Sequence, residues 1–370
     1  MHYKIAIVGG GPSGIGFGIL LKQLGIEDFV ILEKNKVGST FFKWPKEMKL
    51  ITPSFTGHGF GLLDLNAITP DTSPAYTYQK EHLDGKEYGE YLTMMAEHFA
   101  LPIIEGKEVS DIQFIKDHVS FKAGKEPMSA NCLIWATGEY QTPNDQPFEG
   151  ADHCLHNSRV DSWADIEGDD VAVIGGYESG MDAAYHLIQN GKRVTLISRS
   201  KAWESEEADP SLTLSPYTQE RFEHACHSGR LTLRGKSEVL LVKEKDAQYH
   251  LYLSDGTVLR TKTKPILATG FKSGASQLNN FFDWGEDGVP NLTDKDESTK
   301  QPNLFLLGPS VRHKSVIFCF IYKYRQRFAV VAKEIIDRLN MTHDEMVFEK
   351  YKRNQMYLDD LTCCEVKCEC

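Results

Sequence analysis

The sequence predicts an α/β protein in which one parallel-sheet domain is inserted into another. Two stretches carry this prediction, since each runs from a short apolar strand through a glycine-rich turn into a helical pattern, at residues 4–24 and 171–189. A further observation is a pair of apolar strands, 132–138 and 265–270, that end in the same Ala-Thr-Gly. The second glycine-rich stretch lies between these paired strands, which places one domain within the other.

The first glycine-rich turn has the spacing of a dinucleotide-binding G-x-G-x-x-G motif. Gly9 makes the tight turn, Gly11 lets a pyrophosphate approach the backbone, and Gly14 lets the helix pack closely on the strand. Pro12 and Ser13 complete the start of the helix, where free N–H groups bind an anion.

Three other segments complete the first predicted site. The apolar strand 29–32 ends in Glu33, nineteen residues after Gly14, where the motif places a carboxylate for ribose hydroxyls, and Lys34 follows it. Small residues that end apolar strands allow a cofactor to approach the backbone. In this site they are Thr137, Gly138 and Gly308.

The second glycine-rich turn is a degenerate form of the same motif. Its predicted nucleotide contacts in the turn and at the two following strand ends are Gly175, Gly176, Ser179, Gly180, Ser198, Arg199, Thr269 and Gly270. Tyr177 occupies the position of the middle glycine. Arg199 stands where the first site has an acid, and a cation there suits a 2′-phosphate, so NADPH is favoured over NADH. The alternative is a solvated basic turn.

Composition narrows the classes of partner. The chain of 370 residues carries a formal net charge of −11, which disfavours binding to nucleic acid. It has no apolar run of about eighteen residues and enters its first strand directly, so we expect neither a membrane span nor a secretory signal. The expectation is a cytoplasmic enzyme with a small-molecule substrate, and a homodimer is compatible with the sequence.

Cysteines are concentrated at the end of the chain. Four are scattered, at 132, 154, 226 and 319, and the other four fall within the last eight residues: Cys363, Cys364, Cys368 and Cys370. This tail could bind a soft metal ion, act as a redox relay for a thiol partner, or be incidental. The sequence leaves these alternatives open.

The two turns, Glu33, Arg199 and the paired Ala-Thr-Gly strands resemble the two-dinucleotide-binding flavoproteins, which include thioredoxin reductases, flavin-containing monooxygenases and bacillithiol disulfide reductase-like proteins. The resemblance covers roughly residues 1–340 and implies FAD in the first site and NADPH in the second. It also implies two Rossmann-like domains, the NAD(P)H-binding one at 151–284 and the FAD-binding one at 1–150 and 285–345. A C-terminal extension at 346–370 would carry the cysteine tail.

Individual positions depart from each branch of that superfamily. No Cys-x-x-Cys lies between Cys132 and Cys319, unlike in thioredoxin reductases. Ser13 stands where bacillithiol disulfide reductase-like proteins have a cysteine, and Pro309 where disulfide reductases commonly have an aspartate. The linker at 148–159 resembles the monooxygenase linker motif, but its histidines, His153 and His156, do not match the spacing.

Two reactions remain. In the first, NADPH reduces the flavin and O₂ reoxidises it in a monooxygenase-like reaction on a small molecule. In the second, the tail cysteines pass electrons from the flavin to a disulfide or a metal ion. A nucleotide-sensing protein without catalysis is a third class, which intact strand and turn signals in both domains disfavour.

Overall fold

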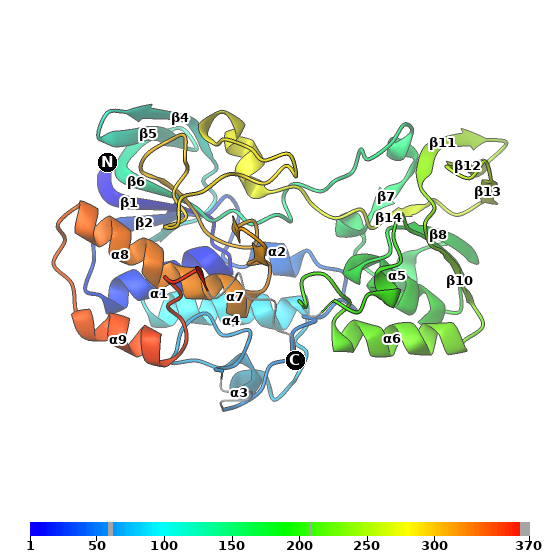
Figure 1. Ribbon diagram of the computed structural model, residues 1–370, viewed down its shortest axis with the longest axis horizontal. Helices are drawn as coiled ribbons and strands as arrows, with labels where there is room; N and C mark the ends of the chain where they lie inside the picture. The colour runs from blue at the N-terminus through cyan, green and yellow to red at the C-terminus, as the bar shows by residue number, and fades with distance from the viewer. Residues whose placement is uncertain (58–61, 208, 363–370) are drawn as a thin grey trace. The chain divides into compact units, whose positions relative to one another are not determined.

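The computed structural model describes residues 1–57, 62–207 and 209–362, and the tail cysteines lie outside them (Figure 1). The chain forms two compact units. Of the described residues, the first unit comprises Met1–Phe42, those from Pro53 to Gln141 and those from Ser273 on, and the second comprises Lys43–Thr52 and those from Thr142 to Lys272. Each unit contains a parallel sheet with helices packed on it, which confirms the predicted α/β class and the insertion of one domain in the other.

The first unit is built on a sheet with strand order β3-β2-β1-β6-β5-β4, to which β15 adds beside β6. Its strands are β1 (His2–Val8), β2 (Phe29–Leu32), β3 (Ile103–Ile104), β4 (Val109–Ile115), β5 (His118–Ala123), β6 (Glu126–Trp135) and β15 (Leu304–Leu306). The pairs among β3, β2, β1, β6 and β15 are parallel, and β4 and β5 continue the sheet as an antiparallel hairpin. The carboxyl ends of β1, β2, β6 and β15 therefore meet at one edge.

Helices of the first unit cover this sheet. They are α1 (Pro12–Gln23), α2 (Ser39–Phe42), α3 (Pro74–Tyr78), α4 (Gly85–His98), α7 (Ile321–Tyr324), α8 (Phe328–Arg338) and α9 (Glu345–Arg353). A short hairpin, β16 (Arg312–His313) and β17 (Val316–Ile317), precedes α7. No helix of the described ranges is long and apolar enough to cross a membrane.

Glycines let α1 lie unusually close to its neighbours. A Cβ on Gly16 would meet the ring of Phe328 in α8 at 2.5 Å, and one on Gly18 would meet Ile31 of β2 at 2.7 Å. Most of α1 is buried as a result. The helix start, which follows the glycine turn, is thereby fixed against the sheet edge.

Apolar residues at helical spacing predict one long helix over 322–339, but in the structure this stretch is interrupted. Residues Arg325–Arg327 form a 3₁₀ turn between α7 and α8, and both arginine side chains are buried. Arg325 donates through Nη1 to the carbonyl oxygens of Asp64 and Ala67, each at 2.6 Å. The tighter turn aims these two cations inward, which an uninterrupted amphipathic helix pattern does not predict.

Arg327 is the centre of a buried ionic cluster. Its Nε lies 2.9 Å from Oδ2 of Asp296 and its Nη2 lies 2.9 Å from Oδ1, with both residues fully buried. His313 Nε2 donates to the same carboxylate at 2.5 Å. Arg327 also donates to the carbonyl of Leu358, so the cluster ties the end of the described chain to the first unit.

The second unit contains a parallel sheet with strand order β10-β9-β8-β14-β7. Its strands are β7 (Leu155–His156), β8 (Asp170–Ile174), β9 (Arg193–Ile197), β10 (Leu231–Arg234) and β14 (Ile266–Leu267). Helices α5 (Glu178–Gln189) and α6 (Pro216–His227) lie side by side and pack through a core shared with β8 and β9 (Figure 1). A separate antiparallel sheet of β11 (Val239–Lys245), β12 (Gln248–Leu253) and β13 (Val258–Thr261) shares a second core with β8 and β9.

A short segment from early in the chain belongs to this second unit. The Glu47 carboxylate accepts hydrogen bonds from the hydroxyl of Ser162 at 2.5 Å and from the N–H of Trp163 at 3.2 Å. The sequence gives no sign of this association, because residues 43–52 lie within the stretch 1–150 that is expected to belong to the FAD-binding domain.

We predict that Arg327→Ala lowers the free energy of unfolding by about 3–5 kcal/mol, because it leaves Asp296 buried without its main cationic partner. Denaturant unfolding monitored by tryptophan fluorescence measures the change. The control is Lys333→Ala on α8, which removes only a partly exposed pair with Asp337 and should cost less than about 0.5 kcal/mol. Equal effects of the two substitutions would contradict the role assigned to the cluster.

Candidate functional site

The first glycine turn has the geometry of a phosphate cradle. Gly9 has a φ of +114°, and a Cβ there would overlap the carbonyl oxygen of Ala136 at the end of β6. A Cβ on Gly14 would overlap the carbonyl oxygen of Gly9. Both glycines are therefore required by close backbone contacts.

The space in front of this turn is open. A Cβ on Gly11 would meet nothing within 4 Å, and within the described chain no side chain caps the start of α1 at this residue. The helix N-terminus therefore presents its backbone N–H groups, together with its partial positive charge, to that space. These features fit the pyrophosphate of a dinucleotide.

Glu33 is held at the end of β2 by backbone donors. It is 8% exposed, and its two carboxylate oxygens accept from the N–H of Gly10 at 2.7 Å and of Asn35 at 2.8 Å. Each oxygen has further lone pairs for ribose hydroxyls. Lys34 instead forms an exposed ion pair with Glu108 at 2.7 Å, away from that carboxylate.

The other predicted residues of the first site converge at the same sheet edge. Gly308 has a φ of +119°, and a Cβ there would lie 3.0 Å from the hydroxyl of Ser13. Thr137 Oγ1 is buried and has no hydrogen-bond partner among the described residues. An orphaned hydroxyl at this edge fits a site that is completed by a bound ligand.

Sequence reasoning missed Glu139 and Ser310 as a pair. The Ser310 hydroxyl donates to Oε1 of Glu139 at 2.8 Å, just beyond the ends of β15 and β6. Burial raises the pKa of Glu139, and the hydrogen bond from Ser310 and the charge of Arg312 partly oppose this. The one signal in the sequence is the position of Glu139 directly after Ala-Thr-Gly.

The second glycine turn repeats the backbone geometry of the first. Gly175 has a φ of +121°, and a Cβ there would overlap the carbonyl of Ala268 at the end of β14. Gly180 packs in the same way on Gly175. The hydroxyl of Tyr177, the residue at the middle glycine position, donates to the carbonyl of Thr213 at 2.7 Å.

A hollow of about 880 Å³ opens in the second unit at this turn. Of the predicted contacts, it is lined by Gly175, Gly176, Ser179, Ser198, Arg199, Thr269 and Gly270. The Arg199 side chain is 82% exposed and lies 3.9 Å from the carboxylate of Glu238, so the pair is loose. The Thr269 hydroxyl donates to the carbonyl of Asn144 at 2.7 Å, which gives it a structural partner.

His156 has a structural position in the second unit. It is fully buried, and its Nε2 lies 3.1 Å from the carbonyl of Gly270, to which it donates. Its Nδ1 accepts from the N–H of Ser158 at 3.2 Å. Burial lowers the pKa of the imidazole, which keeps it neutral.

The described cysteines are not paired with one another. Burial raises the pKa of the Cys132 and Cys154 thiols to about 12, which keeps them protonated and unreactive. Cys226 is exposed on α6 and Cys319 is partly buried. Across the described ranges no group of three or more His, Cys, Asp or Glu side chains could hold a metal ion.

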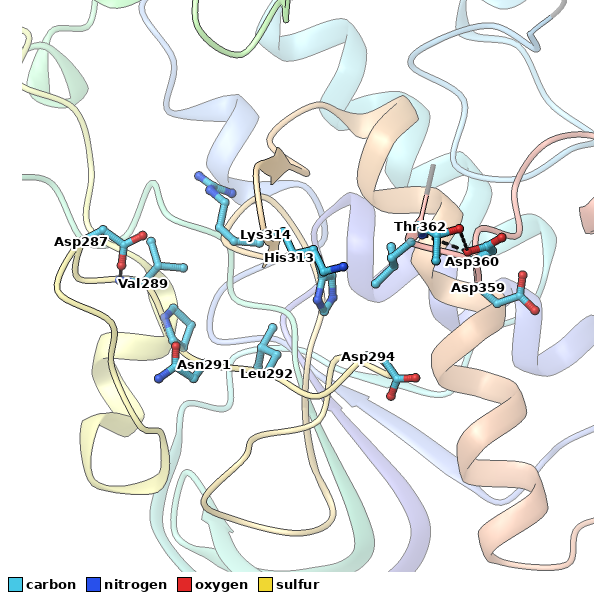
Figure 2. Close-up of a pocket in the computed structure, with 13 residues that line it drawn as sticks. Asp287, Val289, Asn291, Leu292, Asp294, His313, Lys314, Asp359, Asp360 and Thr362 are labelled. Carbon is cyan, nitrogen blue, oxygen red and sulfur yellow. Dashed lines mark hydrogen bonds between the residues drawn. The ribbon is translucent and has the colours of Figure 1, made fainter. Parts of the chain in front are cut away.

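A further hollow of about 600 Å³ lies in the first unit beside the last described residues. Figure 2 shows side chains from residues 287–294, from His313 and Lys314, and from 359–362 around it. The Asp287 and Asp360 carboxylates accept from the N–H groups of Val289 and Thr362, within their own segments. None of the predicted cofactor contacts in the described chain lines this hollow.

A family model and a relative of similar length match most of this chain. The family described as pyridine nucleotide-disulphide oxidoreductase matches residues 6–308. The chain is 25% identical over 345 residues to the bacilliredoxin reductase Bdr of Bacillus subtilis, covering 91% of this chain and 98% of that protein.

Solved structures agree on the fold. The bacillithiol disulfide reductase Bdr (YpdA) of Staphylococcus aureus superposes with a TM-score of 0.75 at 20% identity, over 91% of this chain and 99% of that one. A flavin-containing monooxygenase of Stenotrophomonas maltophilia gives 0.72 at 17% identity, over 91% and 99% of the two chains. Reductases and monooxygenases thus share this architecture, and the fold alone does not select a reaction.

We predict that Gly11→Ala leaves the unliganded protein as stable as the wild type, because the added methyl group meets open space at an ordinary φ of −88°. FAD affinity should fall at least about tenfold, since the methyl group occupies the space of the pyrophosphate. Thermal unfolding of the apoprotein and FAD titration measure the two effects. The comparison variant Gly9→Ala should destabilise the apoprotein itself. Undiminished FAD binding by Gly11→Ala would refute this placement of the pyrophosphate.

We predict that Glu139→Gln stabilises the protein at neutral pH but not in acid. Because the folded-state pKa of Glu139 is raised, the folded protein keeps a proton that the unfolded chain releases, so stability falls as pH rises through this window. A glutamine does not titrate, so the variant does not lose stability in this way as pH rises. Denaturant unfolding of both proteins at about pH 4 and about pH 8 measures the difference in their free energies of unfolding. A stability difference that does not change with pH would be the contrary result.

Proposed function

The chain belongs to the pyridine nucleotide-disulphide oxidoreductase family, and within it we propose an NADPH-dependent flavoprotein that uses O₂ to oxygenate a small molecule. Family membership makes it an FAD-dependent oxidoreductase with FAD and NADPH as cofactors. FAD supplies the redox chemistry when bound, taking electrons from NADPH and delivering them to the oxidant. The overall reaction consumes NADPH, a proton, O₂ and the substrate, and yields NADP⁺, water and the oxygenated product.

The residues of the chain act in this proposal by binding and orientation. In the first unit the turn at Gly11 takes the pyrophosphate and Glu33 the ribose hydroxyls of FAD. In the second unit the turn at 175–180 and Arg199 take NADPH. No acid or base is needed to pass electrons between two well-placed rings, so position is the main contribution of the protein.

The choice of O₂ as the oxidant depends on the side chain at position 13. Ser13 is 4% exposed and lies beside Gly308 at the edge of the first site. Bacillithiol disulfide reductase-like proteins have a cysteine there, and a serine hydroxyl cannot form a disulfide with a substrate thiol. The two buried thiols of the described chain, Cys132 and Cys154, are kept protonated by burial. This favours an oxidant other than a disulfide.

A second candidate is supported by the comparison with bacilliredoxin reductase, which extends over nearly the whole of both chains. In that case the chain would reduce a disulfide, and Cys363, Cys364, Cys368 and Cys370 would carry the electrons in place of a thiol at position 13. These four residues lie outside the described ones, so the candidate depends on their chemistry alone.

The two candidates are separated by following NADPH, O₂ and product together. FAD-loaded protein is reduced without oxygen by NADPH or NADH, and labelled O₂ is then admitted with a thioether or a tertiary amine. We expect faster reduction by NADPH than by NADH and transfer of one labelled oxygen atom to the substrate, detected by mass spectrometry. Release of all the oxygen as hydrogen peroxide would count against the monooxygenase.

The same protein is then tested with low-molecular-weight and protein disulfides. A variant with the four tail cysteines changed to serine, with Cys226→Ser as the exposed-thiol control, tests the relay. Disulfide turnover that is lost only in the tail variant would establish the second candidate. Turnover that survives in both variants would remove the relay.

A further inference from the structure

The hollow in the second unit contains a buried hydroxyl whose role is unassigned. Ser237 is 5% exposed and lines the hollow, and its Oγ has no hydrogen-bond partner among the described residues. It is the one lining side chain in the described chain with such an orphaned buried atom. Buried polar groups are nearly always paired, so a hydroxyl in this state indicates a partner that the protein alone does not supply.

The backbone fixes this hydroxyl next to the predicted nucleotide contacts. Strand β10 pairs with β9 up to Arg234, whose carbonyl accepts from the N–H of Ser198 at 2.9 Å. The chain then turns, and the N–H of Ser237 donates to the carbonyl of Ser198 at 3.0 Å. Ser237 is thus clamped to the residue that directly precedes Arg199.

The turn between β10 and Ser237 also borders a second cation. A Cβ on Gly235 would meet Cγ of Lys201 at 2.5 Å, so the alkyl chain of Lys201 lies on this glycine. On the other side, a Cβ on Gly176 would meet Cβ of Ser198 at 2.6 Å. Two hydroxyl-bearing residues and two cations therefore surround one end of the hollow, beside the glycine turn.

Each of the two cations faces a carboxylate. Lys201 Nζ lies 2.9 Å from Glu204, and Arg199 lies 3.9 Å from Glu238. A bound phosphate must compete with these acids for the cations. A serine hydroxyl has no such competitor, and its hydrogen bond to a dianion is of the stronger, charge-assisted kind.

We propose that Ser237 is a specificity-determining residue of the nucleotide site in the second unit. Its hydroxyl donates to the 2′-phosphate of NADPH, which lies beside Ser198 and Arg199. The inference rests on the proposed function, because it takes the second unit to bind NADPH. It extends that function by assigning part of the discrimination against NADH to an uncharged side chain. The spacing of the glycine motif does not predict this residue.

The test uses two nucleotides that differ only in the phosphate concerned. Adenosine 2′,5′-bisphosphate and adenosine 5′-monophosphate are titrated into the full-length FAD-loaded protein by calorimetry, which requires no turnover. Ser237→Ala should weaken binding of the bisphosphate about tenfold, the effect of one hydrogen bond to a charged group, and leave binding of the monophosphate within about twofold. Arg199→Ala should weaken the bisphosphate in the same selective way, and Thr232→Val, an exposed hydroxyl on β10 outside the hollow, should change neither.

Thermal unfolding of the unliganded variants supplies the second readout. Ser237→Ala should be at least as stable as the wild type, because it removes a buried hydroxyl that has no partner in the unliganded protein. Loss of stability in the unliganded Ser237→Ala protein would assign the residue a structural role and overturn the inference.

The two nucleotide titrations distinguish a failure of the role proposed for Ser237 from a failure of the proposed NADPH-dependent function. If the wild type prefers the bisphosphate but Ser237→Ala binds both nucleotides as the wild type does, only the role of Ser237 is overturned. Equal weakening of both nucleotides would place the hydroxyl on a part that they share, which also overturns it. If the wild type shows no preference for the bisphosphate, the assignment of NADPH to the second unit fails together with the inference.

Discussion

The close approach of a glycine turn to a neighbouring strand is the constraint on which both units depend. In each unit the first glycine of the turn has φ near +120° and its Cα faces a backbone carbonyl, that of Ala136 for Gly9 and that of Ala268 for Gly175. Any side chain at these positions would push the strand end away. The contact fixes the helix start relative to the strand ends, and through them the positions of Glu33 in one unit and Arg199 in the other.

Local patterns in the sequence were sufficient to predict these strand–turn–helix units. The strand at 29–32, its terminal Glu33 and the strand at 193–197 are found where apolar runs bounded by turn residues place them. The contacts that sequence reasoning missed are long-range ones. The break at Arg325–Arg327 depends on carbonyl groups near residue 64 and on Asp296, and nothing in a helical pattern reports such distant partners. The attachment of residues 43–52 through Glu47 is of the same kind.

The candidate sites also contain some residues that local sequence patterns predict and others that depend on long-range contacts. Glycines and strand-end residues were found from spacing, because phosphate binding uses backbone and therefore leaves a fixed signature. Glu139 with Ser310, and Ser237, were not found, because they are brought to their sites by strand pairings that join segments up to about 170 residues apart. A shared fold supplies the backbone contacts, and the chemistry of a site also depends on side chains of this kind. The reaction is therefore harder to predict from sequence than the cofactors are.

The two turns differ at the middle position of the motif, which is Gly11 in the first and Tyr177 in the second. The residues differ in the volume of their side chains and not in backbone conformation. Gly11 has a φ of −88° and Tyr177 a φ of −108°, both of which any residue adopts. Glycine at this position therefore matters only because it leaves room for the phosphate, whereas Tyr177 carries a side chain whose hydroxyl donates to the carbonyl of Thr213. Under the proposed function, binding of NADPH in the second unit would depend less on contacts to its pyrophosphate and more on the groups near Arg199 and Ser237. A tight cradle suits a cofactor that stays bound, and a looser one with selectivity at the adenosine end suits a nucleotide that must leave after each turnover.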